Sequence, residues 1–245
     1  MTSSTLITVP GSQGVLARAA KWAAIAILAV IALRFFWLHA LRYTNVTEHT
    51  YRRYWPYRGW LMVHIIGGSL ALLLGPLQFF SGLRRWNMKL HRWAGRLYLA
   101  GVVIGSVAAT YMGFVTKYRA FGISLVAMAF AWLSCASMAY IAIRRRQVPA
   151  HKEWMIRSYV VTYGFVVFRV IQDSKLLESF KVESLALSAW LCWTIPLLFA
   201  EMALQWRRTV GPARARPGRS AGMNATVNQR KSETSDGQRI GFQET

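Results

Sequence analysis

Six apolar runs, separated by short polar segments, alternate along this chain of 245 residues. Each run is close to or above the roughly 20 residues that an α-helix needs to cross a bilayer. The runs extend approximately over residues 22–41, 60–82, 90–116, 121–143, 154–172 and 185–206. The pattern therefore predicts an all-α fold, a polytopic membrane helix bundle with six transmembrane helices.

The first and fifth runs need a separate argument. The fifth contains Arg157 and Arg169, but both lie near its ends, where a long side chain can reach the membrane surface. The first resembles the apolar part of a signal peptide. Arg34 interrupts it and no small-residue cleavage site follows it, which favours an uncleaved anchor. Both runs are therefore counted as spans.

Hydrophobic residues make up 54% of the chain and charged residues only 16%, with a formal net charge of +21. This balance is too apolar for an ordinary soluble domain. The positive charges fall between the apolar runs, as in membrane proteins, so we expect no nucleic-acid partner. Cys135 and Cys192 both lie inside apolar runs, so neither a disulfide nor a thiolate metal site is expected.

The distribution of Lys and Arg predicts the orientation. The N-terminal segment, the second and fourth loops and the stretch from Arg207 to Arg219 after the sixth run carry 15 of these residues, against 8 in the other loops. The positive-inside rule then places both termini in the cytoplasm, and we expect a multi-pass inner (plasma) membrane protein. We predict a cytoplasmic N-terminal segment (1–20), a transmembrane domain (21–206), and a basic, disordered cytoplasmic tail (207–245) that can rest on the anionic inner leaflet.

The second and third runs each contain a stripe of small residues at four-residue spacing. Such stripes let two helix backbones approach closely, so these two helices are expected to pack tightly, with the glycines as packing devices. The stripes consist of Gly67, Ala71 and Gly75, and of Gly101, Gly105, Ala109 and Gly113.

Two histidines, His91 and His151, each stand at the start of a predicted helix on the cytoplasmic side. Ionisable groups in a bilayer cost free energy, so a pair at one depth is a candidate site. Two imidazoles from two helices can grip a flat cofactor such as haem b, with Arg96 and Arg157 as partners for its propionates. The alternatives are interfacial residues in contact with headgroups, or a proton or substrate relay. His to Arg is five residues in one run and six in the other, so duplication of the motif is weakly supported.

Four more polar residues complete the candidate set. Gln78 and Glu201 lie toward the cytoplasmic ends of the second and sixth runs, and Glu201 needs a cation that either arginine of the histidine motifs could supply. His64 and Arg169 lie at the opposite ends of the second and fifth runs. The helical face from His64 to Gln78 is polar at both ends and small in between. It either lines a path across the bundle, or His64 and Arg169 are partners that fix helix packing.

Several motifs resemble a bacterial family of predicted membrane proteins that is catalogued as a domain of unknown function. The resemblance covers about residues 55–206 and implies a topology but no activity. The motifs are the run from His64 to Gln78, His91-Arg-Trp-Ala-Gly-Arg96-Leu-Tyr, His151-Lys-Glu-Trp-Met-Ile-Arg157-Ser-Tyr, Arg169, and the stretch 193–201.

A looser resemblance is to the six-span cytochrome b-561 proteins, which bind two haems through four histidines on four central helices. The resemblance implies one haem between His91 and His151. For a second haem His64 offers a ligand, but the fourth run contains no histidine, so His39 or His49 would have to replace the missing one.

Three functions follow as hypotheses. The first is a b-type cytochrome or electron carrier that uses His91 and His151, with a quinone or a redox protein as partner. The second is a small proton-coupled transporter or permease that uses the face from His64 to Gln78. The third is a membrane scaffold without chemistry. No zinc motif, phosphate loop or nucleophile triad is present in the sequence, so no enzyme class is assigned.

Overall fold

The computed structural model describes residues 12–180 and 183–210. The chain divides into two compact units, Met1–Leu204 and Gln205–Thr245, and the first holds the helix bundle. The long helices are α1 (Ser12–Phe35), α3 (Arg58–Phe79), α5 (Met88–Val115), α6 (Arg119–Arg144), α7 (Val148–Asp173) and α8 (Glu183–Thr209). The short elements are η1 (Phe36–Ala40), η2 (Leu41–Thr44), α2 (Glu48–Tyr51), η3 (Arg52–Tyr57), α4 (Ser81–Trp86) and η4 (Glu178–Phe180).

All six expected transmembrane helices are present. The segments that are long and apolar enough to cross a membrane are Ile25–Thr44, Tyr54–Phe79, Met88–Val115, Arg119–Arg144, Val148–Asp173 and Glu183–Trp206. The described residues contain no strand. The prediction of an all-α, six-span membrane bundle is therefore confirmed. Most of the expected tail, 207–245, and the first 11 residues of the expected N-terminal segment lie outside the described residues.

Local sequence explains where α5 and α7 begin. Asn87 precedes α5, and its side chain accepts a hydrogen bond from the backbone N–H of Leu90 at 3.0 Å, which caps the helix. Helix α7 begins at Val148 with Pro149 in its first turn, where a missing N–H has no cost. The apolar run predicted a start near residue 154. The helix begins earlier because its first turns carry polar side chains that a hydropathy pattern does not count.

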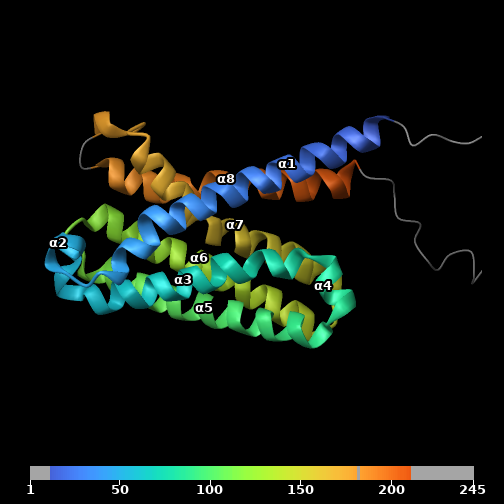
Figure 1. The fold of residues 1–245 in the computed structure, drawn as a ribbon, viewed down its shortest axis with the longest axis horizontal. Helices are drawn as coiled ribbons and strands as arrows, with labels where there is room; N and C mark the ends of the chain where they lie inside the picture. Colours follow the sequence, from blue (N-terminus) through green and yellow to red (C-terminus); the bar gives the residue numbers. More distant parts are fainter. Residues whose placement is uncertain (1–11, 181–182, 211–245) are drawn as a thin grey trace, which may run out of the picture. The chain divides into compact units, whose positions relative to one another are not determined.

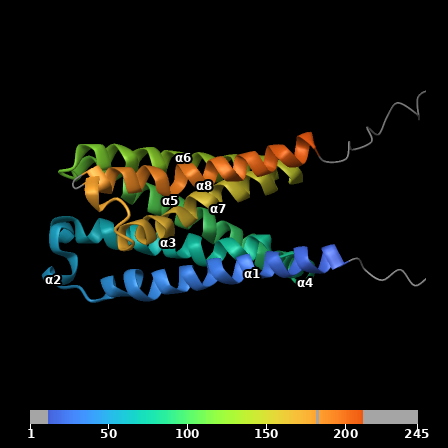
Figure 2. The same ribbon diagram turned by 90° about the horizontal axis from the view of Figure 1, so that it is seen from above.

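Four helices surround the core of the bundle. Helices α3, α5, α6 and α7 pack in cyclic order, so α5 and α7 lie on a diagonal (Figures 1 and 2). Helices α1 and α8 lie outside these four; α1 packs against α7, and α8 is joined to α7 by the Arg157–Glu201 and Gln172–Ser188 hydrogen bonds. Only 6% of the α1 span and 17% of the α8 span are buried, against 33–44% for the other four spans. The diagonal arrangement is what brings side chains of α5 and α7 together in the core.

Helices α3 and α5 approach each other through glycines, as the stripes of small residues predicted. A Cβ added to Gly67 would lie 2.7 Å from the backbone oxygen of Gly101 and 2.7 Å from the backbone nitrogen of Gly105. Only glycine permits this spacing, because backbone atoms cannot rotate away from a side chain. Gly75 instead packs against α7, because the ring of Tyr159 fills the space beside it.

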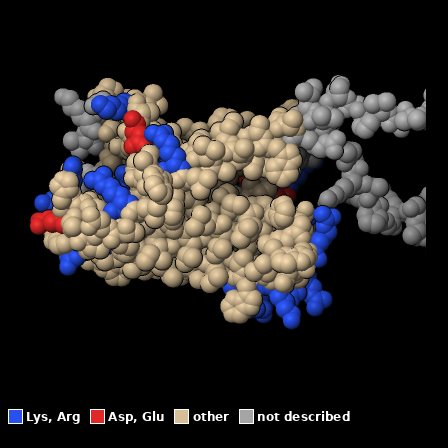
Figure 3. All heavy atoms as spheres, viewed as in Figure 1, with Lys and Arg blue, Asp and Glu red and all other residues tan. Residues whose placement is uncertain are grey.

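The surface of the bundle suits a lipid environment. Figure 3 shows Lys and Arg gathered toward the two ends, with a broad band of uncharged residues between them. Large apolar side chains are exposed on the helices, among them Val107, Phe114, Phe130, Leu198 and Phe199. A contiguous apolar surface of this size is unfavourable in water and is accommodated by lipid. The protein is therefore a multi-pass membrane protein.

Candidate functional site

The bundle has two ends, which we name the His91 end and the His64 end. Helices α5 and α7 begin at the His91 end, where α3 and α6 finish. His91 and His151 are each the fourth residue of their helix, and their backbone N–H groups donate to the carbonyl groups of Asn87 at 3.2 Å and Gln147 at 2.9 Å. The two helices therefore start in the same way around the two histidines.

A buried hydrogen bond fixes the relative depth of these histidines. The hydroxyl of Tyr98 lies 2.7 Å from Oγ of Ser158 and joins α5 to α7 across the core. Tyr98 is seven residues after His91, and Ser158 is seven residues after His151. Seven residues make nearly two turns, about 10.5 Å along the axis, and return to the same helical face. His91 and His151 therefore lie at similar depth, on the same faces of α5 and α7 as the buried Tyr98 and Ser158.

Helix α6 holds the ring of His151. Its Nδ1 lies 2.9 Å from the backbone oxygen of Ala139. A carbonyl oxygen can only accept, so Nδ1 carries the proton and donates it, and Nε2 of the neutral ring keeps its lone pair. Histidines that bind a metal commonly have this arrangement, with one nitrogen donated to a carbonyl and the other available as ligand.

His91 and Gln78 have hydrogen-bonding capacity that no described residue fills. His91 Nδ1 and Gln78 Nε2 are both buried, and neither has a hydrogen-bond partner in the described part of the chain. Gln78 lies against the His91 face of α5, since its Oε1 is 3.1 Å from the position of a Cβ on Gly95, one turn after His91. Buried polar groups are nearly always satisfied, so two such atoms at one end mark a candidate ligand site. Gln78, which the sequence analysis expected as a neighbour of the histidines, thus packs one turn from His91 along α5.

The two arginines of the histidine motifs do not face this pair. Arg157 Nη2 lies 2.6 Å from Oε2 of Glu201, and its Nε donates to the same oxygen at 2.8 Å, so Arg157 is the cation that Glu201 was expected to need. Its guanidinium also lies 4.7 Å from the ring centroid of Trp154. Arg96 is exposed, with its guanidinium 5.3 Å from the ring centroid of Trp93. The structure therefore places Gln78 against the His91 face of α5, with His151 at the same end of the bundle, while Arg157 pairs with Glu201 and Arg96 is exposed.

A polar cluster that the sequence did not reveal occupies the core between the two ends. Trp132 of α6 donates its indole N–H to Oγ1 of Thr162 at 2.8 Å, and the Tyr98 hydroxyl lies 3.1 Å from the same oxygen. Thr162 in turn donates to the backbone oxygen of Ser158 at 2.9 Å. All four side chains are buried. In the sequence, the only sign of this cluster is that Ser158 and Thr162 lie on the same face of the fifth span as His151.

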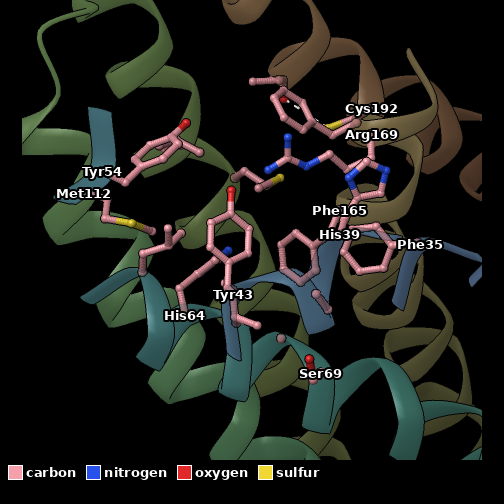
Figure 4. A pocket seen from close by; sticks show the side chains of 18 of the residues that line it. Phe35, His39, Tyr43, Tyr54, His64, Ser69, Met112, Phe165, Arg169 and Cys192 are labelled. Carbon is pink, nitrogen blue, oxygen red and sulfur yellow. Dashed lines mark hydrogen bonds between the residues drawn. The ribbon is translucent and has the colours of Figure 1, made fainter. Parts of the chain in front are cut away.

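Helix α5 holds the ring of His64 at the opposite end of α3. His64 Nδ1 donates to the backbone oxygen of Gly105 at 2.9 Å. The packing partner of His64 is thus a carbonyl group, and not Arg169 as one interpretation of the sequence expected. His64 and Arg169 instead both line a cavity at the His64 end, to which Figure 4 gives a close view.

The face of α3 from His64 to Gln78 is covered by helix α7. Phe165 packs against Gly68, with its ring 3.3 Å from the position of an added Cβ, and the Tyr159 ring fills the space beside Gly75. The hydroxyl of Tyr159 also donates to the backbone oxygen of Leu72 at 3.3 Å. Aromatic side chains of α7 therefore pack along this face at Gly68, Leu72 and Gly75.

Comparison with known proteins returns one family. The model of a family described as "Predicted membrane protein (DUF2306)" matches residues 61–204, which include α5, α6 and α7 and most of α3 and α8. No curated protein and no solved structure matches the chain significantly. The resemblance to the cytochrome b-561 proteins finds no support in these comparisons.

Proposed function

This chain belongs to the DUF2306 family of predicted membrane proteins, and we propose that it is a b-type electron carrier with haem held between His91 and His151. The observation that carries the proposal is the similar depth of the two histidines, on the faces of α5 and α7 that carry Tyr98 and Ser158. A helix bundle that binds haem through two imidazoles needs this arrangement.

The residues at the His91 end fit such a group. His151 donates Nδ1–H to Ala139 and so offers Nε2 to a metal. His91 Nδ1 and Gln78 Nε2 are buried polar atoms without partners, as expected where a bound group supplies part of the surroundings. When bound, haem supplies one-electron chemistry. His91 and His151 would hold its iron, and the Ala139 carbonyl would keep one imidazole in the ligating tautomer.

A membrane electron carrier requires a partner that reaches it in or beside the bilayer, and a lipid-soluble quinone or a redox protein meets that requirement. The excess of Lys and Arg in the loops of the His91 end supports a cytoplasmic position for this end and for both termini in a bacterial inner membrane. A reporter fused after Arg208 should be active only in the cytoplasm. Activity of that fusion in the periplasm would contradict the orientation.

The haem proposal is tested by absorbance spectroscopy. The full-length protein, purified in detergent from haem-replete cells and reduced with dithionite, should show sharp b-type bands. His91→Ala and His151→Ala should each abolish the bands. His49→Ala is the matched control, because His49 is exposed in α2 at the opposite end of the bundle and its loss should leave the spectrum unchanged. A colourless, monodisperse wild-type preparation would refute the proposal.

A further inference from the structure

A cavity lies at the His64 end of the bundle, where the segment after α1 meets α3, α6 and α7 (Figure 4). Its volume is about 140 Å³. An apolar cavity of about 150 Å³ can hold a benzene molecule, so this one has room for an apolar group of about six heavy atoms. Its walls are mainly apolar and include Phe35, Leu61, Ile65, Leu72, Leu125 and Phe165.

A second hollow of about 480 Å³ adjoins the cavity and has a different character. The two share Tyr43, Tyr54 and Arg169 as lining residues. The second hollow, which we name the arginine cleft, is also lined by Arg42 and Arg52, and the described residues that line it include no acid. Three guanidinium groups without a carboxylate create a positive potential that attracts anions. The cavity and the cleft therefore combine an apolar space with a cationic one.

Arg169 stands where the cavity and the cleft meet. It lies near the end of the α7 span and is half-buried. Among the described residues no carboxylate lies within 4.0 Å of its guanidinium. Asp173, four residues later in α7, accepts a hydrogen bond from His39 at 3.0 Å. Figure 4 shows the Arg169 side chain extending into the space beside Tyr43. A guanidinium at the edge of a low-dielectric region is stabilised by a counter-charge, which a bound anion would supply.

The loop between α1 and α3 positions the other two arginines. Arg52 has a φ of 45°, a left-handed conformation that is unfavourable for a residue with a side chain. The preceding Tyr51 is buried, and its hydroxyl donates to the backbone oxygen of Tyr43 at 2.8 Å, which ties this turn to the segment that carries Arg42. Unfavourable backbone conformations of this kind occur preferentially at ligand sites.

We propose that the cavity and the arginine cleft form one binding site for an amphipathic anion. Its carboxylate or phosphate oxygens bind Arg169, with Arg42 and Arg52 beside it, and its apolar ring or chain occupies the cavity. The ligand is either a free amphipathic acid or the headgroup and adjoining chain of a membrane lipid. Arg169 lies within the part of the chain that matches the family, whereas Arg42 and Arg52 precede it. The inference is independent of haem, since the site lies at the opposite end of the bundle.

Equilibrium dialysis with labelled octanoate tests the anionic part of the site. The full-length protein is used in a nonionic maltoside detergent, and binding to protein-free micelles is subtracted. We expect saturable binding that Arg169→Gln weakens at least tenfold. Arg58→Gln is the matched control, because Arg58 is exposed at the same end, contacts Trp55 and lines neither hollow. Equal weakening by both substitutions, or by neither, would overturn the proposal, as would octanol binding as tightly as octanoate.

A second pair of variants tests the apolar part. Ser69 lines the cavity and points into it from α3 in Figure 4. Ser69→Leu should fill part of the space and weaken octanoate binding at least fivefold, whereas Ser69→Ala should leave the affinity within twofold of wild type. Equal affinities of these two variants would overturn the assignment of the cavity. So would inorganic phosphate that competes as well as octanoate, because phosphate has no apolar part.

The source of the ligand is decided in the same assay by adding phosphatidylglycerol to the micelles. Displacement of octanoate by this lipid supports a lipid headgroup as the ligand. Unchanged octanoate binding in its presence supports a free amphipathic carboxylate. Both results retain the anionic chemistry of the site, and the Arg169→Gln variant must lose affinity in either case.

Discussion

Replacement of Gly67 by alanine should force α3 away from α5. The new Cβ would lie 2.7 Å from two backbone atoms of α5, whereas ordinary contacts of this kind measure 3.4–4 Å. The helices would have to separate locally by at least about 0.7 Å. Overpacking of this kind costs about 1–3 kcal/mol, and the upper half of that range applies because neither neighbour is a flexible side chain. The better helix propensity of alanine returns at most about 1 kcal/mol, so the net loss of stability is about 1–2 kcal/mol.

Gly59 provides the matched control within the same helix, because a Cβ added there would meet nothing within 4 Å. Thermal unfolding in detergent can be followed by the fluorescence of the 11 tryptophans. For a chain of this size a loss of 1–2 kcal/mol lowers the apparent melting temperature by about 2–8 °C. Gly59→Ala should not lower it. If the two variants melt at the same temperature, the close approach of α3 and α5 is not a feature of the native fold.

Three further predictions use the same unfolding assay. Thr162→Val leaves the indole N–H of Trp132 buried without its acceptor and should lower the free energy of unfolding by about 1–3 kcal/mol; an unchanged melting temperature would contradict that hydrogen bond. A double-mutant cycle of Arg157→Gln and Glu201→Gln should give a coupling energy of about 1 kcal/mol, kept modest by the 39% exposure of the Glu201 side chain, and zero coupling would argue against the ion pair. Burial and the nearby Tyr43 raise the pKa of the Tyr51 hydroxyl above its ordinary value near 10, so its contribution is complete below about pH 10 and is lost as the pH rises through the folded-state pKa. Tyr51→Phe should therefore melt lower than wild type at pH 8 and lose less stability above pH 10.

The sequence predicted the six spans because bilayer thickness fixes the length of an apolar helix, and no tertiary information is needed for that step. The stripes of small residues also identified a true close contact, Gly67 against Gly101 and Gly105. The sequence could not show which side of each helix packs against which neighbouring helix. Only the packing of α7 against α3 reveals that Tyr159 and Phe165 cover the face from His64 to Gln78.

The sequence alone aligns the two histidine motifs at the wrong residues, and the reason is physical. His to Arg differs by one residue between them, and the tyrosines at 98 and 159 look equivalent because each follows its arginine by two residues. In the structure the equivalent of Tyr98 is Ser158, its hydrogen-bond partner across the core, and each follows its histidine by seven residues. Because Tyr98 and Ser158 are different residue types, a comparison of residue identities cannot recognise that they occupy equivalent positions. The shared spacing acquires meaning only once α5 and α7 are known to face each other.

The centre of the bundle separates its two ends, and this bears on the choice between electron transfer and transport. Tyr98 and Trp132 are buried and hydrogen-bonded within the core cluster, and the Phe165 ring packs between Trp132 and His64, with centroids 5.0 and 5.3 Å away. An ion or a polar substrate that crosses a membrane needs a continuous set of polar groups or water along its path. Between His64 and Gln78 the described core therefore holds the Phe165 ring and the hydrogen-bonded cluster of Tyr98, Trp132, Ser158 and Thr162. The haem proposal requires no polar path between the two ends, so this packing of the core is compatible with it.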